Sequence, residues 1–384
     1  MTFTFSTAAE VRFGCGVLEQ LADHVAASGA RALVFINRTL FEQAEVMQWM
    51  EASFRTHTIQ VHFIALPGSE PVADDIDRWT KTAQDFESQV IVGIGGGSTI
   101  DTAKAVAAMA ANPGLVRDYL EGVGALTLRQ PALPFIAVPT TAGTGSEVTK
   151  NAVLTVPELG VKRSLRSPLL LPRLALLDPT LTLSLPPALT AETGMDALTQ
   201  LIESYVSVKA NPLTRALCLQ GVALAGRFLQ RAVQNGRDID AREGMMLASL
   251  LSGMALANSG LGAAHGIAAA LGGTCGVRHG RACAVLLPEV MAVNLPGCIT
   301  GFAEIYRAFS GQQERDDRSA AELAVTTVRT LARRIGITER FEAHEVEPRH
   351  IPALVKGSQG SSMKGNPRAL SEAEIEAIIA AVTS

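Results

Sequence analysis

The stretch from Val90 to Lys104 constrains the fold of this chain more than any other. It begins with a short apolar run, passes through the three glycines Gly95, Gly96 and Gly97, and continues as an alanine-rich helical pattern. A buried strand followed by a glycine turn and a helix presents backbone N–H groups to a phosphate. The glycines allow close approach of a ligand, and the hydroxyl of Ser98 adds a donor. The pattern is neither G-x-G-x-x-G nor a Walker A motif, but it predicts a phosphate-binding turn.

Strands and helical segments alternate through the first 180 residues. The apolar runs at 31–37, 58–64, 89–94 and 134–139 are typical of buried strands, and 71–86 has helical character. This alternation predicts a largely parallel sheet covered on both faces. Ligands of such sheets bind at the carboxyl ends of the strands, where Asn37 and the turns at 95–98 and 139–146 are expected.

The pattern changes after Asp178-Pro179, where strands become hard to find. Helical spacing predicts helices over 189–207, 212–232, 241–258, 262–271, 317–336 and 371–382. A chain of 384 residues usually forms more than one domain. We therefore expect an α/β domain over residues 1–180 and an all-helical domain over residues 181–384.

The composition excludes several classes of protein. The chain is 47% hydrophobic and 18% charged with a net charge of −4, which favours a globular protein and disfavours nucleic acid or membrane partners. Its five cysteines are dispersed and odd in number, which fits a reducing compartment better than a disulfide framework. The first residues lack the pattern of a signal peptide, so the sequence predicts a cytoplasmic location.

The turn at 139–148 is rich in hydroxyl groups. It contains Thr140, Thr141, Thr144 and Ser146 together with two glycines. Hydroxyl and backbone donors at a strand end suit a pyrophosphate or a carboxamide. The alternative is a Ser/Thr-rich surface loop without a ligand.

The helical half contains four candidate metal ligands. Asp196 and Gln200 are four residues apart and share a helix face, and His265 and His279 follow later in the chain. An acid, an amide oxygen and two imidazoles can surround a divalent metal. The sequence alone does not show that the four side chains converge. The alternative is that the histidines are hydrogen-bonded core residues.

A series of motifs resembles the iron-containing (group III) alcohol dehydrogenases, a family that includes the maleylacetate reductases. The motifs occur in the family's order along most of the chain: Val11-Arg12-Phe13-Gly14-x-Gly16, Gly95-Gly96-Gly97-Ser98-x-x-Asp101-x-x-Lys104, Pro139–Glu147, Asp178-Pro179, Leu185-Pro186-Pro187, Gly194-Met195-Asp196-Ala197, Gly260-Leu261-Gly262-x-x-His265, His279-Gly280 and Asn366-Pro367-Arg368.

The resemblance implies a Rossmann-like dinucleotide-binding domain, a helical domain and an active site in the cleft between them. It implies hydride transfer between NAD or NADP and a small alcohol, aldehyde or ketone. The implied cofactor-binding residues are Asn37, Gly95, Gly96, Gly97, Ser98, Asp101, Thr140, Thr141, Thr144, Ser146 and, at the ribose, Lys162. The implied metal ligands for iron or zinc are Asp196, Gln200, His265 and His279, with His265 and His279 also catalytic. A homodimer is the oligomer that the family suggests.

Two positions depart from the family pattern. Gln200 stands where the family usually has a histidine ligand, and Ala269 replaces another histidine one turn after His265. An amide oxygen binds iron or zinc less well than imidazole. The alternatives are therefore a metal-independent reductase similar to the maleylacetate reductases, in which His265 and His279 stabilise the alkoxide, or a cofactor-binding protein with an impaired metal site. A lyase of the dehydroquinate synthase type is disfavoured, since it needs a stronger metal cage and more basic residues.

The residues after the first predicted strand bear on the choice of cofactor. Many family members place an aspartate there, which binds the adenosine ribose and repels a 2′-phosphate, whereas this chain has Asn37-Arg38. Loss of the acid beside a guanidinium predicts tolerance of NADP in addition to NAD.

Overall fold

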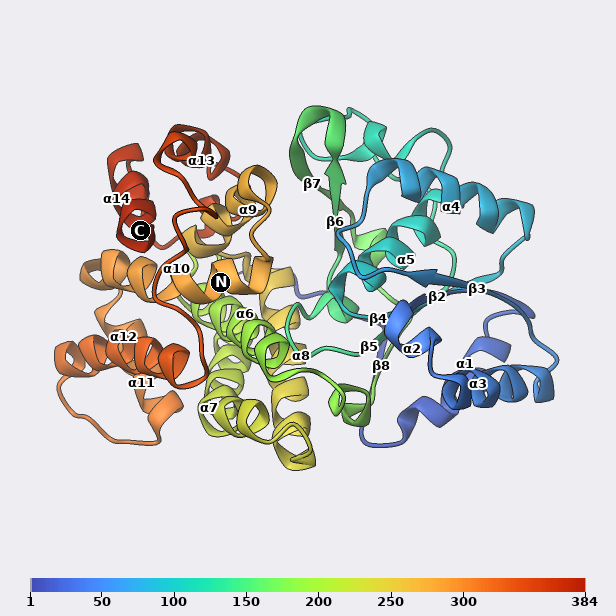
Figure 1. Cartoon of the computed structure of the whole chain (residues 1–384), viewed down its shortest axis with the longest axis horizontal. Coiled ribbons are helices and arrows are strands. Elements are labelled where there is room, and N and C mark those ends of the chain that lie inside the picture. Colours follow the sequence, from blue (N-terminus) through green and yellow to red (C-terminus); the bar gives the residue numbers. More distant parts are fainter. Residues whose placement is uncertain (1, 384) are drawn as a thin grey trace. The chain divides into compact units, whose positions relative to one another are not determined.

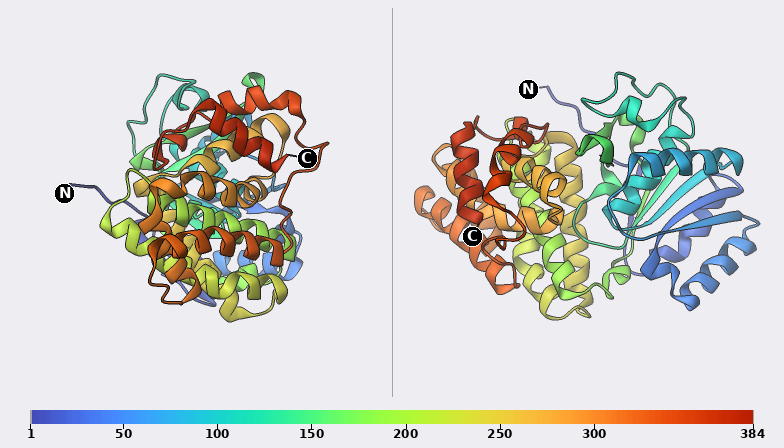
Figure 2. Two further views of the ribbon diagram at one scale, coloured as in Figure 1. Left: turned by 90° about the vertical axis from the view of Figure 1, so that its left-hand side faces the viewer. Right: turned by 45° about the horizontal axis from the view of Figure 1, so that its top comes forward.

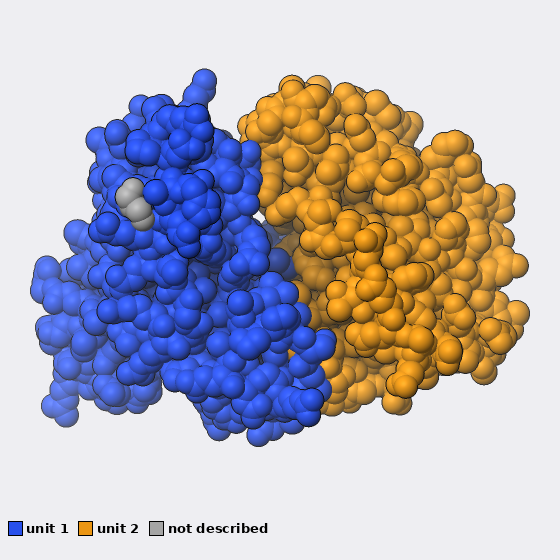
Figure 3. Space-filling model, viewed as in Figure 1, with its two compact units in different colours: residues 1–5, 142–145, 183–384 blue, residues 6–141, 146–182 orange. Residues whose placement is uncertain are grey.

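The computed structural model describes residues 2–383, which form two compact units (Figure 3). The α/β unit comprises Ser6–Thr141 and Ser146–Thr182. The helical unit comprises the residues up to Phe5, the short segment Ala142–Gly145 and the chain from Leu183 onward.

A six-stranded parallel sheet organises the α/β unit, as the alternating pattern predicted (Figure 1). Every neighbouring pair is parallel, and the strand order is β1-β8-β5-β4-β2-β3. The strands are β1 (Glu10–Phe13), β2 (Arg31–Asn37), β3 (Gln60–Leu66), β4 (Val90–Gly95), β5 (Phe135–Pro139) and β8 (Leu174–Leu177). The sequence did not predict the antiparallel hairpin of β6 (Asn151–Val156) and β7 (Val161–Arg166).

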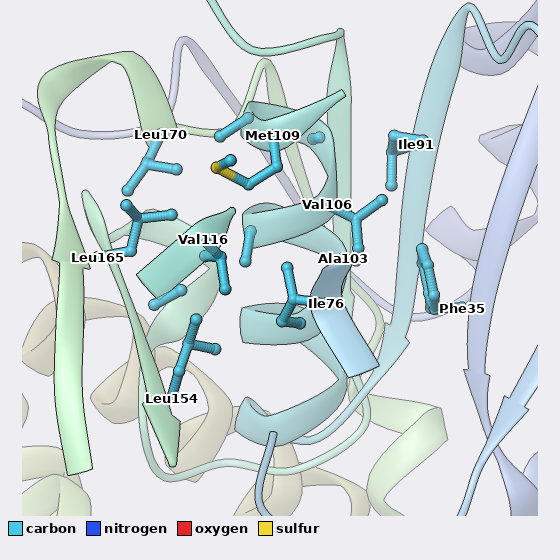
Figure 4. Close-up of a cluster of buried hydrophobic side chains, with 14 of the residues drawn as sticks. Phe35, Ile76, Ile91, Ala103, Val106, Met109, Val116, Leu154, Leu165 and Leu170 are labelled. Atoms are coloured by element: carbon cyan, nitrogen blue, oxygen red, sulfur yellow. The ribbon is translucent and has the colours of Figure 1, made fainter. Parts of the chain in front are cut away.

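Side chains alternate between two hydrophobic cores along the central strands. In β2, Leu33 and Phe35 join the core under α4 (Ala73–Asp85) and α5 (Gly97–Met109), which Figure 4 shows. The intervening Ala32, Val34 and Ile36 join the opposite core with α1 (Leu21–Ala26) and α3 (Ala44–Thr56). Helices therefore cover both faces of the sheet (Figure 2), which explains why the central strands β4, β5 and β8 are buried along their whole length, whereas the edge strands β1 and β3 carry polar residues.

The order of the strands places a topological switch point between β2 and β4. From β2 the chain adds β3 on one side, and it then returns to place β4 on the other side of β2. Helices after the two strands lie on opposite faces, which opens a crevice at their carboxyl ends. Asn37 ends β2 and Gly95 ends β4, so the predicted phosphate turn lies at this switch point.

The helical unit is built around α6 (Pro187–Val206), which is buried along most of its length. The other helices are α7 (Pro212–Gln234), α8 (Ile239–Ser259), α9 (Ala263–Cys275), α10 (His279–Asn294), α11 (Ile299–Ser310), α12 (Asp317–Arg334), α13 (Ile351–Gly357) and α14 (Glu372–Val382). The sequence did not predict α10, α11 or α13. The predicted capping box of Ser371 and Glu374 is present at the start of α14.

None of the helices within residues 2–383 is by itself long and apolar enough to cross a membrane. Among the described helices, α8 and α9 would be long and apolar enough if taken together, but a bend of 98° separates them.

A buried lysine fixes α5 to the segment that follows β5. The Nζ of Lys104 donates to the carbonyl oxygens of Ser146 and Asn151, each at 2.8 Å, and to the hydroxyls of Ser146 and Thr149, each at 3.0 Å. Asp101 lies 3.7 Å from the same ammonium group, and burial lowers the pKa of Lys104 to about 8. The helix behind the glycine turn and the segment 146–151 are thus held together by one cation.

We predict that Lys104→Met destabilises the α/β unit. The substitution leaves Asp101 and two backbone carbonyls without their cation, and removing one member of a buried pair costs about 3–5 kcal/mol. The unfolding midpoint should fall by about 2–4 °C for each kcal/mol lost. Lys81→Met, at an exposed helix position, is the control. Equal midpoints for the two variants in thermal unfolding would contradict the role given to Lys104.

Candidate cofactor and metal sites

The glycine turn presents free backbone donors at the start of α5. Gly96 is the N-cap residue of the helix and, as a glycine, has no side chain that could cap the first turn. A Cβ atom at Gly95 would lie only 2.5 Å from the hydroxyl oxygen of Thr99, so this position requires glycine. Uncapped N–H groups and the helix dipole together suit the pyrophosphate of a dinucleotide.

Asn37 connects the ends of two strands beside this turn. Its Oδ1 accepts a hydrogen bond of 2.8 Å from the N–H of Leu40, which caps the short helix α2 (Arg38–Phe41). Its Nδ2 donates to the hydroxyl of Thr140 at 3.1 Å. The structure therefore places Asn37 and Thr140 together, and it leaves the side chain of Arg38 exposed at the first position of α2.

Other residues expected at the cofactor are engaged in different ways. Asp101 accepts hydrogen bonds from the hydroxyl of Ser146 and, at 2.9 Å, from the N–H of Val153. Lys162 forms an ion pair of 3.0 Å with Glu70. Thr144 belongs to the short segment that packs within the helical unit. The contacts of Asp101 hold β6 to α5, and its cofactor role stays a prediction, as does that of Lys162.

In the helical unit, Asp196, His265 and His279 converge from three helices. Oδ1 of Asp196 on α6 lies 3.3 Å from Nε2 of His265 on α9 and 3.7 Å from Nε2 of His279 on α10. The two imidazole rings have centroids 5.4 Å apart. The fourth member is Cys283, and one donor atom from each of the four residues lies within 4.8 Å of every other. This donor set and spacing fit a divalent metal ion.

Glu203 determines the orientation of His265. Its carboxylate accepts hydrogen bonds from the N–H groups of Gly262 at 2.9 Å and Ala264 at 2.6 Å, at the positive end of α9. It also lies 2.7 Å from Nδ1 of His265. With Nδ1 engaged by Glu203, Nε2 faces Asp196 and is the nitrogen that can bind a metal once it carries no proton.

Gln200 lies beside the cluster but directs its nitrogen toward it. Nε2 donates to Oδ2 of Asp196 at 3.3 Å, and the hydroxyl of Ser252 lies 2.8 Å from Oε1. An amide nitrogen has no lone pair for a metal. In this arrangement Gln200 supports Asp196 from the side away from the histidines.

The electrostatics of the cluster favour a cation. Burial alone would raise the pKa of Asp196, but a hydrogen bond with His265 and the charge of His279 lower it. The charge interaction with Cys283 raises the pKa of His279 to about 9, against the effect of burial. Burial would lower the pKa of His265, yet its interactions with Cys283, Asp196 and Glu203 raise it well above its ordinary value. Positive charge is therefore stabilised at this point.

The sequence reasoning missed two residues of this site. Glu203 is seven residues after Asp196 and so lies on the same face of α6, and Cys283 is four residues after His279 on α10. The helical spacing was present in the sequence for both. This spacing alone does not single out either residue, because an acid in a helix and a dispersed cysteine each have ordinary structural explanations.

Comparison with known families covers nearly the whole chain. The family described as "Iron-containing alcohol dehydrogenase" matches residues 8–179, and "Fe-containing alcohol dehydrogenase family, C-terminal" matches residues 190–383. The long-chain-alcohol dehydrogenase 1 of Geobacillus thermodenitrificans is 34% identical over 95% of this chain and 93% of its own length.

Solved structures agree in fold and in family. A crystal structure of 1,3-propanediol oxidoreductase has a TM-score of 0.93 and 33% identity, and it covers 99% of each chain. The sulfoacetaldehyde reductase of Bifidobacterium kashiwanohense, solved in complex with NAD+, has a TM-score of 0.88 and 27% identity, covering 100% of this chain and 99% of its own. With its parallel sheet, glycine turn and Asp–His–His cluster, this chain belongs to the iron-containing alcohol dehydrogenase family of oxidoreductases.

Proposed function

We propose that the protein is an NAD(P)-dependent dehydrogenase of small alcohols that also reduces aldehydes, and that Asp196, His265 and His279 hold its divalent metal. The observation that carries the proposal is that His265 and His279 both face Oδ1 of Asp196, at 3.3 and 3.7 Å, while Glu203 engages the other nitrogen of His265. A core histidine with a purely structural role would not need a second carboxylate facing its other nitrogen.

A bound divalent metal supplies Lewis acidity, polarising a carbonyl oxygen so that hydride addition becomes easier. The side chains of the cluster prepare for this before any substrate arrives. Glu203 holds the proton on Nδ1 of His265, and Gln200 donates to the outer oxygen of Asp196. The His279 side chain is 38% exposed, whereas those of Asp196 and His265 are buried, so the substrate oxygen approaches past His279.

The α/β unit holds the dinucleotide, whose nicotinamide supplies the hydride. The free N–H groups at the start of α5 bind the pyrophosphate, and Asn37 with Thr140 lines the adjoining strand ends. The NAD+ in the related sulfoacetaldehyde reductase supports this assignment. The exposed guanidinium of Arg38 supports the acceptance of NADP as well, because it attracts a 2′-phosphate that an acid after this strand would repel.

The first test is turnover with both cofactors. Protein loaded anaerobically with Fe(II) or Zn(II) should reduce members of a panel of short aldehydes, followed by loss of reduced-nicotinamide absorbance. The metal-free protein should be much slower. Lack of turnover for every aldehyde, alcohol and oxo acid with either cofactor would reject the proposal.

We predict that Glu203→Gln weakens metal binding. The carboxylate now accepts hydrogen bonds with both oxygens, so the NH₂ group of a glutamine would face at least one N–H donor. A neutral amide oxygen also binds the Nδ1 proton of His265 less strongly than a carboxylate does. Replacing such a supporting partner costs about 10- to 100-fold in metal affinity. Competition with a chromophoric chelator measures the change without any assay of activity.

The control for this variant is Glu289→Gln. Glu289 is on α10 with His279 and Cys283, but it pairs with Arg329 at 2.8 Å and not with the cluster. Its replacement should leave the affinity for metal unchanged. Equal affinities for the wild type and both variants would show that Glu203 does not position His265.

We predict that Arg38→Ala lowers kcat/KM for NADPH more than for NADH. Loss of the guanidinium removes the charge that attracts a 2′-phosphate, and one charge-assisted hydrogen bond is worth about 1.5–3 kcal/mol. The ratio of the two kcat/KM values should therefore shift toward NADH by about tenfold or more. Arg129→Ala, at another exposed position of the same unit, should leave the ratio unchanged. An unchanged ratio in Arg38→Ala would exclude a role in cofactor choice.

A further inference from the structure

The fourth donor of the cluster is a cysteine, whereas the sequence suggested Gln200 for that position. Cys283 is fully buried on α10, one helical turn after His279, and its sulfur lies 3.7 Å from Nε2 of that histidine. The sulfur is also within 4.8 Å of the facing donor atoms of Asp196 and His265. Cys283 belongs to the hydrophobic core around α10, and its thiol lies at the point where that core meets the cluster.

Three of the six separations among the four donor atoms match the edges of a coordination tetrahedron, and the other three are within 4.8 Å. Ligands bound at about 2.0–2.3 Å to a tetrahedral ion are separated from one another by about 3.3–3.8 Å. The observed separations are 3.3 Å from Asp196 to His265, 3.7 Å from Asp196 to His279 and 3.7 Å from His279 to Cys283. Only small side-chain movements are needed for all four donors to contact one ion.

Gln200, in contrast, is occupied by other hydrogen bonds. Its nitrogen donates to Oδ2 of Asp196, the oxygen that does not face the histidines, and its oxygen lies 2.8 Å from the hydroxyl of Ser252. To bind a metal, the amide would have to turn over and lose its hydrogen bond to Asp196. Cys283 needs no such rearrangement.

From this geometry we infer that Cys283 is a ligand of the metal, so that the site is Asp196, His265, His279 and Cys283 while Gln200 only positions Asp196. The inference deepens the proposed function and rests on its metal site. Cys283 binds as a thiolate, and its proton passes to solvent when the metal enters. A tetrahedral set with one sulfur, two nitrogens and one oxygen suits zinc, because thiolate is a softer ligand than the amide oxygen it replaces.

The position of Cys283 also leaves room for a substrate. Cys283 lies on the buried side of the cluster, whereas the exposed side is at His279. With Cys283 as a ligand, the residues that would hold the metal come from the buried side, and the side at His279 would stay open to a substrate oxygen.

Cobalt substitution tests the inference by spectroscopy and not by activity. Full-length protein titrated anaerobically with Co(II) should develop an intense near-ultraviolet band from thiolate-to-cobalt charge transfer, saturating at one equivalent. In zinc-loaded protein, X-ray absorption should show one sulfur at about 2.3 Å. Cys283→Ser should lose the band. Its affinity for Co(II) should fall by more than about 100-fold, since loss of a residue that only supports a ligand costs at most about that much.

Two control variants separate Cys283 from its neighbours. Cys275→Ser removes another cysteine of the helical unit, one that contacts His350, and it should keep the band. Gln200→Ala removes the amide and should also keep the band, with one equivalent of metal. If Gln200→Ala abolishes metal binding while Cys283→Ser retains the band, the assignment of the two residues is wrong.

The wild type alone already decides the question, even if a variant fails to fold. One equivalent of bound metal without a charge-transfer band and without a sulfur ligand would overturn the role of Cys283 and leave the proposed function intact. Turnover without any stoichiometric metal would overturn the metal site itself, and the inference with it. A band that survives in Cys283→Ser but disappears in Cys275→Ser would place the metal elsewhere and reject the inference.

Discussion

The buried carboxylate of Glu203 is the contact on which the site in the helical unit depends. It joins α6 to the first turn of α9 and, through the same atoms, sets the proton of His265. A carboxylate without partners would be costly at this depth, and the positive end of a helix with an imidazole provides them. Gly262 allows the approach, because a Cβ there would lie 2.8 Å from Oε1 of Glu203. One carboxylate thus joins two helices and orients the side chain of His265.

The α/β unit uses the same principle with the charges reversed. There a buried ammonium, that of Lys104, gathers carbonyl and hydroxyl oxygens from the segment after β5. The contacts of Lys104 fix the middle of α5, behind the glycine turn at its start. In each unit a buried charged side chain holds neighbouring segments together beside the candidate site.

Much of the fold could be predicted from residues near one another in the sequence. The apolar central strands indicated a sheet covered on both faces, and the glycines after Gly93 indicated the phosphate turn. Convergence over distance was different. His265 and Asp196 are 69 residues apart, and only the packing of α9 against α6 brings them together. The family motifs predicted that pairing, but they also predicted Gln200 as a metal ligand. Cys283 carried no motif, so its role follows from the folded chain alone.

The four residues Ala142–Gly145 have a consequence for how these units can be separated. They interrupt the α/β unit in sequence yet pack within the helical unit, where a Cβ at Gly143 would lie 2.7 Å from Cβ of Thr193 and one at Gly145 only 2.5 Å from Cα of Gly253. The chain therefore passes between the units four times, at residues 5–6, 141–142, 145–146 and 182–183. Neither unit is a continuous piece of sequence. A single cut near residue 182 would take this tightly packed segment away from α6 and α8, so the two halves cannot be exchanged between proteins as simple cassettes.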